Sequence, residues 1–376
     1  MQSSSYRSLF DLDENYIYFN SAGSSPLPIK AKEAAINSYD FISYTKHKES
    51  ELFKWLDNIR SLSGNLINAK SSEIALITNT SMGLNIIARG AELKSSDSVL
   101  VHRTEFPSNM VPWLKLRDKG VDVRIVDSKG FPTPEDFFKR VDKSTKIIAV
   151  SFVRFYDGFK FDLESLGTFC RENNILLVVD GIQGVGVVPI DVKKLNVDIL
   201  SCAGAKWLCS PCGCGFLYIS ENVQEKIDSP FAGWLSWLTE KRFENSIQPL
   251  KEPVDMTRFE WATLPYSSFA AFEKTLELFI DIGIENINKH ITELIDHLIQ
   301  FISENDKYEI ISSLKPEERS GFISFKALEK SRDLLKKLED EKVVISYREG
   351  GIRVSPHLYN TMDEMKRFCE ILNDFS

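Results

Sequence analysis

Four common catalytic signatures are missing from this sequence of 376 residues: G-x-G-x-x-G, G-x-x-x-x-G-K-[ST], H-E-x-x-H and G-x-S-x-G. In other proteins these patterns hold a dinucleotide or a nucleotide phosphate, ligate zinc, or present a serine nucleophile. Their absence removes the usual sequence support for a nicotinamide dehydrogenase, a P-loop NTPase, a zincin or a serine hydrolase.

Long hydrophobic runs and an excess of positive charge are missing as well. The longest apolar stretches, such as residues 146–153 and 175–179, have the length of strands and fall short of the roughly 18 residues that a membrane-spanning helix needs. Lys and Arg total 46 against 54 Asp and Glu, which gives a formal charge of -8. We therefore expect neither nucleic acid nor a membrane as a partner.

Residues 1–16 lack the basic segment and apolar core of a secretory signal, and the chain has only six cysteines. Together these features favour reduced thiols and a cytoplasmic location. Four of the cysteines lie close together in the sequence, at Cys202, Cys209, Cys212 and Cys214. We interpret them as small buried thiols. The alternatives are a metal site or sulfur carrier built on these thiolates, or a redox or persulfide role for Cys209 or Cys212.

Strand-sized apolar runs alternate with helical patterns through the centre of the chain. Strands are expected over residues 73–78, 98–102, 121–126, 146–153, 175–180, 198–202 and 215–219, and helices over 81–89, 109–119 and 162–172. This alternation predicts an α/β fold with a largely parallel sheet covered on both faces.

After Trp261 the pattern changes. Helices are expected over residues 269–280, 284–301, 331–341 and 362–372, and short strands over 308–311, 321–325, 343–346 and 351–354. This mixture predicts a smaller α+β domain. We expect the large domain to span residues 20–255 and the small domain to combine residues 1–19 and 256–376.

Asp180 and Lys206 supply a pair of groups with a specific chemical use. Asp180 ends an apolar strand, and Lys206 follows the next strand through a turn of small residues, 203–205. Both are therefore expected at the carboxyl edge of the sheet, where open α/β folds bind ligands. Pyridoxal phosphate (PLP) needs a lysine for its Schiff base and an acid for its ring nitrogen, and Gln183 could reach its phenolic oxygen. The alternative is a surface lysine and an aspartate in an ordinary turn.

Residues 79–83 lie between a strand and a helix. The backbone N–H groups there, with the hydroxyls of Thr80 and Ser81, point to where a phosphate would be held. The alternative is an ordinary helix N-cap formed by Thr80 or Ser81.

Seven segments carry a resemblance to a known family: residues 18–28, 79–85, 105–109, 179–184, 204–208, 258–260 and 352–357. The chain resembles the class V aminotransferase family of PLP enzymes nearly end to end, with Asp180, Gln183 and Lys206 in family order. That family includes cysteine desulfurases, kynureninase-like lyases and isopenicillin N epimerase-like proteins. The resemblance implies fold type I, with a mostly parallel seven-stranded sheet between helices, and a homodimer with shared active sites.

The resemblance also implies the roles of individual residues. Lys206 would hold the cofactor and move the substrate's α-proton, Asp180 would pair with the ring nitrogen, and Gln183 would bind the phenolate. The phosphate ligands would be Thr80, Ser81, the amide of Met82 and, from the neighbouring subunit, Thr263. Arg353 would bind the substrate carboxylate, and Arg154 and Asn109 are further expected substrate contacts.

Several positions depart from the family pattern. Phe106 stands where many members stack a histidine on the cofactor, and Ala205 replaces the histidine that often precedes the lysine. Ala203 replaces the usual phosphate-binding hydroxyl, so Ser201 is a candidate substitute. Arg154 and Phe155 occupy the place of a Ser-Asn substrate contact.

These departures leave Lys206 as the sole evident acid–base group, so we expect transamination of an α-amino acid. The alternatives are epimerisation, elimination by a lyase, or a protein that binds PLP without turnover. Cysteine desulfurases need a loop thiol shortly before the carboxylate-binding arginine, but residues 346–352 contain no cysteine, which argues against that activity. Arg348 in this stretch is either a contact for a side-chain acid or a solvated arginine.

Two further features have less specific interpretations. His290 and His297 are interpreted as histidines at the edge of the core. Trp234 and Trp237 either line the substrate pocket or contact the partner subunit.

Overall fold

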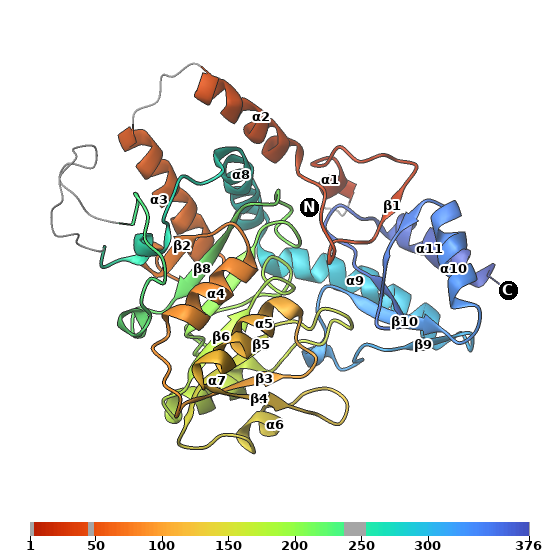
Figure 1. The fold of residues 1–376 in the computed structure, drawn as a ribbon. Coiled ribbons are helices and arrows are strands. Elements are labelled where there is room, and N and C mark those ends of the chain that lie inside the picture. The colour runs from red at the N-terminus through yellow and green to blue at the C-terminus, as the bar shows by residue number, and fades with distance from the viewer. Residues whose placement is uncertain (1–3, 44–48, 237–252, 376) are drawn as a thin grey trace.

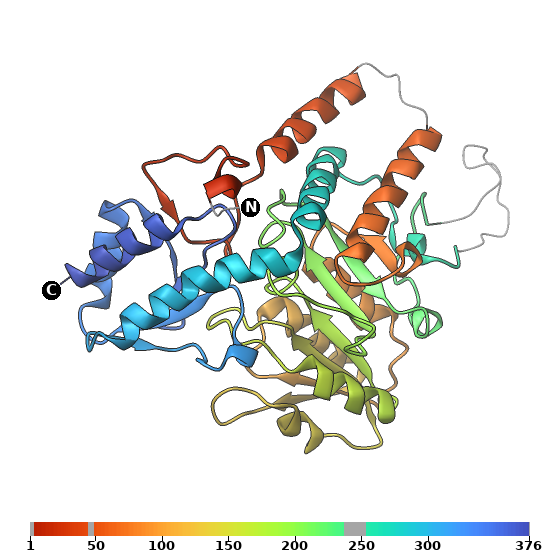
Figure 2. The same ribbon diagram turned by 180° about the vertical axis from the view of Figure 1, so that it is seen from behind.

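The protein is built around two sheets, a large central one and a smaller one formed by the C-terminal third (Figure 1). The computed structural model describes residues 4–43, 49–236 and 253–375. The N-terminal segment lies beside the C-terminal elements in both views of the ribbon (Figures 1 and 2).

The central sheet has seven strands in the order β2-β8-β7-β6-β5-β3-β4. Neighbouring strands from β4 to β7 are parallel, and β8 is antiparallel to both of its neighbours. The strands are β2 (Ile74–Leu76), β3 (Ser98–His102), β4 (Asp122–Val126), β5 (Thr145–Ser151), β6 (Leu176–Asp180), β7 (Ile199–Ala203) and β8 (Gly215–Ile219). The predicted α/β class and mostly parallel seven-stranded sheet are confirmed.

Side chains that alternate along these strands enter two separate hydrophobic cores. In β5, Ile147 and Ala149 join the core beneath α4 (Thr80–Gly90) and α5 (Val111–Leu114), whereas Ile148 and Val150 join the other. That second core also contains side chains of α3 (Glu49–Asn65) and α7 (Leu163–Glu172), and it continues into the smaller part of the molecule. Burial on both faces explains why these strands read as continuous apolar runs.

The single helix expected over residues 109–119 is wrong in detail. The chain there forms η2 (Pro107–Asn109), α5 and η3 (Lys115–Lys119). Pro112 lies in the first turn of α5, where its missing N–H is tolerated, but it cannot donate within a longer helix. The apolar spacing was correct, and proline divided the helix.

The smaller sheet is antiparallel, in the order β12-β13-β10-β9. Its strands are β9 (Tyr308–Ile310), β10 (Ile323–Ala327), β12 (Ser346–Arg348) and β13 (Gly351–Val354). The remaining elements of this part are helices α9 (Ile284–Ser303), α10 (Ser331–Asp340) and α11 (Met362–Asn373), with β1 (Ile17–Tyr18) paired to β11 (Val343–Val344). The predicted small α+β part is confirmed, and the exact domain boundaries stay predictions.

Four helices complete the described chain: α1 (Ser4–Arg7), α2 (Ile29–Ser43), α6 (Pro134–Phe138) and α8 (Tyr266–Ile282). α2 and α3 both pack against α8, which follows them by more than 200 residues. None of the helices in the described ranges combines the length and apolarity that a membrane crossing requires.

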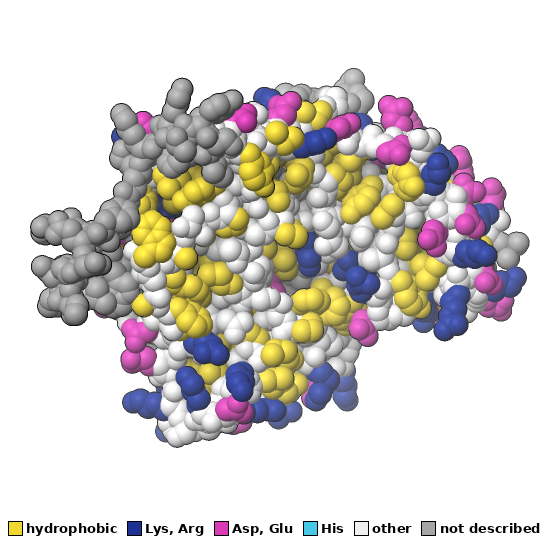
Figure 3. All heavy atoms as spheres, turned by 45° about the horizontal axis from the view of Figure 1, so that its top comes forward, with side chains coloured by type: hydrophobic (Ala, Val, Ile, Leu, Met, Phe, Trp, Pro, Cys, Tyr) yellow, Lys and Arg dark blue, Asp and Glu magenta, His cyan; other side chains and the backbone are white. Residues whose placement is uncertain are grey.

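Large hydrophobic side chains also lie on the surface. In the face drawn in Figure 3 they are spread across the surface, and dark blue Lys and Arg side chains lie near its centre as well as along its margins. Ile36 and Tyr39 of α2, together with Phe231, Trp234 and Val254, are among the exposed ones.

Candidate active site

Asp180 and Lys206 lie at the same edge of the central sheet, as predicted. Asp180 is the last residue of β6, which pairs in parallel with β7, and Lys206 follows β7 in a tight turn. Two backbone hydrogen bonds hold this turn, one from the Ser25 N–H to the Ala205 carbonyl (3.1 Å) and one from the Cys209 N–H to the Lys206 carbonyl (3.0 Å).

Burial shifts the pKa of both groups in opposite directions. It lowers the pKa of the Lys206 amine to about 8. The charges of Arg353 and Arg348 lower this pKa further, whereas the nearby charge of Asp180 raises it. Burial raises the pKa of the Asp180 carboxyl to about 6, although the Ile182 N–H donates to Oδ1 (3.0 Å) and the Lys206 charge opposes the shift. A cationic group placed beside Asp180 would lower this pKa again and stabilise the carboxylate.

Gln183 is held from both ends of its amide. Its Nε2 donates to the Ala22 carbonyl (3.0 Å), and its Oε1 accepts from the Trp207 indole (2.8 Å). Because Nε2 carries a second hydrogen, one N–H can still serve a ligand.

His357 supports the lysine turn from behind, a role that the sequence gave no sign of beyond its place in a matched segment. Its Nδ1 accepts from the Leu358 N–H (2.7 Å), so Nε2 carries the hydrogen and donates to the Trp207 carbonyl (2.9 Å). Burial lowers the pKa of His357 to about 4, so this ring is neutral near pH 7.

The start of α4 lies beside β7, and Asn79 is its N-cap, rather than Thr80 or Ser81. The Thr80 hydroxyl accepts from the Ala203 N–H (3.0 Å), so its own hydrogen is available. The Met82 amide, expected at a phosphate, donates instead to Asn79 Oδ1 (2.9 Å).

Two serines support this helix start. The Ser201 hydroxyl, a candidate phosphate ligand, donates to the Thr80 carbonyl (3.0 Å) and thereby ties α4 to β7. The Ser81 hydroxyl lies 2.7 Å from that of Ser108.

Phe106 lies over the lysine. Its ring centroid is 5.6 Å from Lys206 Nζ and 5.2 Å from the Phe155 ring, and 38% of the residue is exposed. This position fits the expectation that Phe106 stacks on a cofactor ring.

The neighbouring Glu105 is a partly buried acid that sequence reasoning missed. Its Oε1 accepts from the Ser151 N–H (2.8 Å), its Oε2 accepts from Asn109 Nδ2 (2.9 Å), and burial raises its pKa to about 7. Asn109 is fully buried and also accepts from the Trp113 indole (3.2 Å). Asn109 therefore supports Glu105, and its expected contact with a substrate stays a prediction.

Arg353 emerges from β13 and is almost completely buried. Its Nε donates to the Ser346 hydroxyl (3.0 Å) and its Nη1 to the Phe155 carbonyl (2.6 Å). Burial and the Arg348 charge lower its pKa to about 10. The guanidinium keeps further N–H groups with which it can bind a carboxylate.

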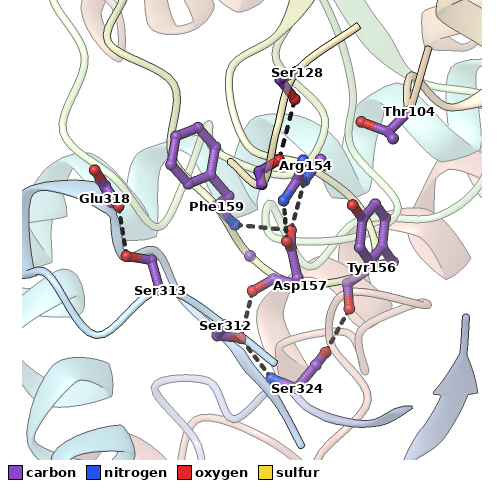
Figure 4. Close-up of polar contacts among 12 residues, drawn as sticks. Thr104, Ser128, Arg154, Tyr156, Asp157, Phe159, Ser312, Ser313, Glu318 and Ser324 are labelled. Atoms are coloured by element: carbon purple, nitrogen blue, oxygen red, sulfur yellow. Dashed lines mark hydrogen bonds and ion pairs between the residues drawn. The ribbon is translucent and has the colours of Figure 1, made fainter. Parts of the chain in front are cut away.

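Arg154 does not lie free to meet a substrate. Its guanidinium forms a buried two-bond ion pair with Asp157, in which Nε lies 2.9 Å from Oδ1 (Figure 4). The aromatic rings of Phe131, Tyr156 and Phe159 surround it at 4.7 to 5.3 Å. The expected substrate contact is thus replaced by an internal ion pair.

That ion pair shapes the segment that touches the small sheet. The hydroxyls of Ser312 and Ser324 donate to the carbonyls of Asp157 and Tyr156 (2.5 Å each; Figure 4). The adjacent Phe155 carbonyl anchors Arg353. Arg154 therefore acts on the site through the position of this backbone.

The clustered cysteines do not form a metal site within the described residues, where no three His, Cys, Asp or Glu side chains are arranged to hold an ion. Cys202, Cys209 and Cys214 are buried and Cys212 is exposed. Burial raises the pKa of Cys209 to about 12, so its thiol is protonated near pH 7.

The other residues singled out in the sequence differ in burial. His290 is buried, with Nε2 2.9 Å from the Asn360 carbonyl. Thr263 and Trp234 are exposed, and Trp237 lies outside the described residues.

Comparisons with known proteins give matches along nearly the whole chain. The family model described as Aminotransferase class-V matches residues 17–368. A probable cysteine desulfurase of Methanothermobacter thermautotrophicus is 27% identical, with 100% of this chain and 98% of that protein covered. An uncharacterized aminotransferase of Schizosaccharomyces pombe is 29% identical, with 97% and 93% covered.

Solved structures show the same fold. A mutant of C-DES with glycine covalently linked to its PLP cofactor matches with a TM-score of 0.90 at 22% identity, covering 98% of this chain and 99% of that one. The apo cysteine desulfurase of Thermococcus onnurineus matches with a TM-score of 0.89 at 23% identity, covering 98% and 97%.

Proposed function

The chain belongs to the class V aminotransferase family, whose enzymes use PLP, and we propose that it moves the α-proton of an amino acid through Lys206. The observation that carries this proposal is the meeting of Lys206 and Asp180 at one sheet edge, each close enough to shift the pKa of the other.

The residues present fit the cofactor in three ways. Asp180 is a buried acid that a cationic ring nitrogen would stabilise. Gln183 has an unused N–H for the phenolic oxygen, and Thr80 has a hydroxyl hydrogen for the phosphate. When bound, PLP supplies an electron sink for the pair left behind when a bond to the α-carbon breaks.

The protein's own groups then divide the work. Arg353 binds the α-carboxylate and so fixes which bonds of the α-carbon face Lys206. The Lys206 amine takes the α-proton at Nζ, and a pKa near 8 keeps a useful fraction of it neutral at cellular pH. Phe106 closes the face of the bound cofactor opposite Lys206, and its ring cannot carry a proton.

As the net reaction we propose elimination of a β-substituent, a lyase activity. The relatives named probable cysteine desulfurases support this choice, as does the structural match to C-DES, a cystine C–S lyase whose structure holds its product cysteine persulfide. Residues 346–352 contain no cysteine and Cys209 is protonated, so we propose that the leaving group departs without attack by an enzyme thiol.

Transamination is the second candidate. It is favoured by Lys206 being the evident acid–base group at the site, because one amine can carry a proton from the α-carbon to the cofactor. Relatives named as uncharacterized aminotransferases in Schizosaccharomyces pombe and Bacillus subtilis point the same way.

A panel of amino acids mixed with the PLP-loaded protein tests the proposal. Elimination releases a keto acid and ammonia and leaves PLP intact, whereas transamination converts PLP to pyridoxamine phosphate. Lys206→Ala should abolish both, while Lys194→Ala, a change at an exposed lysine, should abolish neither. An absorbance spectrum unmoved by every amino acid, or borohydride labelling of a different lysine, would refute the proposal and favour a binding role.

A further inference from the structure

The hairpin of β12 and β13 carries two arginines on one face. Ser346 pairs with Arg353 and Arg348 pairs with Gly351 across the strands. Residues two apart along a strand share a face, and the hydrogen bond from Arg353 to Ser346 shows which face that is. Arg348 and Arg353 are therefore diagonal neighbours, whose spacing in antiparallel sheets is about 7–8 Å.

These arginines lie near Lys206, and neither of them is paired with an acid among the described residues. In the described part of the chain, no ion pair involves Lys206, Arg348 or Arg353. The charges of both arginines lower the pKa of Lys206, and that of Arg348 also lowers the pKa of Arg353, so the three cations lie within electrostatic reach of one another. Like charges on one face of a sheet repel, and an anion between them would relieve this cost.

The nearby acids do not fill that role. Asp180 is close to Lys206 and is assigned to the ring nitrogen, and Glu105 accepts hydrogen bonds from Ser151 and Asn109. Glu349 follows β12 in the turn of the hairpin, and its charge acts on Tyr156. The site therefore holds more positive charge than one α-carboxylate neutralises.

The two arginines also differ in how they are held. Arg353 is buried and spends N–H groups on Ser346 and Phe155, which fixes it for one ligand position. Arg348 is exposed and spends an N–H of Nη1 on the Tyr347 carbonyl (2.9 Å), so most of its donors face outward. Such a fixed inner and adjustable outer arginine suits a molecule with two anionic ends.

Building on the proposed function, we propose that Arg348 binds an anionic group on the substrate side chain, so that the substrate is an α-amino acid with an acidic side chain. Aspartate, glutamate, cysteine sulfinate and O-phosphoserine share this chemistry. They differ in their acidic group, which is a carboxylate, a sulfinate or a phosphate. They also differ in whether a β-substituent can leave.

The test measures the reaction of the PLP-loaded protein with these four acidic amino acids and with their neutral counterparts asparagine, glutamine, cysteine and serine. Arg348→Gln should lower kcat/KM for the best acidic substrate by about 10- to 100-fold, as expected for a lost charged hydrogen bond, and change that for a neutral one by less than about threefold. Arg348→Lys should recover part of the loss. Arg367→Gln, a matched change on α11, should have no effect.

A binding measurement gives a readout independent of turnover. Succinate should raise the melting temperature of the PLP-loaded wild type more than butyrate does, and this difference should vanish in Arg348→Gln. If Arg348→Gln lowered kcat/KM equally for acidic and neutral substrates, or if the wild type preferred the neutral ones, the assignment of Arg348 would be overturned while the proposed function stayed intact. No reaction with any amino acid, together with no succinate effect, would overturn both.

Discussion

Burial changes the chemistry of Lys206 more than the surrounding charges do. Desolvation is the largest influence on its amine, with Asp180 on one side and two arginines on the other acting in smaller and opposite ways. A lysine in this setting is a base near neutral pH, which an exposed lysine is not.

This setting predicts the pH at which the apoprotein captures PLP. Only the neutral amine attacks the aldehyde, so the rate of capture should rise with pH and level off above about 8, well below the usual lysine pKa of 10.5. Arg353→Gln removes a positive charge and should move the midpoint to higher pH. Stopped-flow absorbance measures both, with Arg367→Gln as the control. A wild-type midpoint near 10.5 would show that the amine is not desolvated.

Residue-level prediction from the sequence succeeded where the fold dictates position. Asp180 and Lys206 follow adjacent parallel strands, and such strand ends meet at one edge. It did not foresee the partners of two other expected site residues. Arg154 pairs with an aspartate three residues away, and Asn109 turns to Glu105, because both side chains are buried beside those acids. Neither partnership is visible in a pattern of residue types.

At the scale of elements, the placement of α4 depends on one close approach to β7. A methyl group on Gly83 would overlap the Ser201 hydroxyl, and that hydroxyl bonds to the Thr80 carbonyl at the helix start. Glycine is thus required in the second turn to bring Thr80 to the sheet edge.

Gly83→Ala should therefore weaken both folding and cofactor binding. Overpacking of this kind costs about 1–3 kcal/mol of unfolding free energy, and a displaced Thr80 should raise the dissociation constant for PLP. Adding Ser201→Gly makes room, so the double variant should bind PLP more tightly than Gly83→Ala alone. Urea denaturation and PLP titration measure the two effects. Additive losses in the double variant would contradict a direct clash.

Elements were predicted best where the hydrophobic period is strong and local. All seven central strands and the long helices α8 and α9 lie close to their expected positions. The expected helix over residues 109–119 failed because of Pro112. The N-terminal helices α2 and α3 were not predicted, since their stability comes from packing on α8, a contact that no local pattern contains.

For the whole molecule, the contact between the two sheets sets the geometry of the site. The segment around Arg154 and Asp157 follows β5 of the large sheet, and it accepts hydrogen bonds from Ser324 of β10 and from Ser312, which follows β9 (Figure 4). Arg353 of β13 reaches across to the Phe155 carbonyl. The carboxylate-binding arginine and the lysine thus come from different parts of the chain, and the contact between the two sheets holds them together.

The most demanding whole-molecule prediction concerns sites shared between subunits. The family resemblance implies that Thr263 reaches the phosphate of a neighbouring subunit, and Thr263 is exposed, as such a role requires. Thr263→Glu should repel that phosphate, and Lys206→Ala should remove the base, so each variant alone should be inactive. In a mixed dimer, the subunit that keeps Lys206 receives an intact Thr263 from its partner. Coexpression with random pairing should then restore about a quarter of the wild-type sites, because half of the dimers are mixed and each has one complete site. Activity no greater than the sum of the separate variants, with dimers present by size-exclusion chromatography, would show that each subunit holds its phosphate alone.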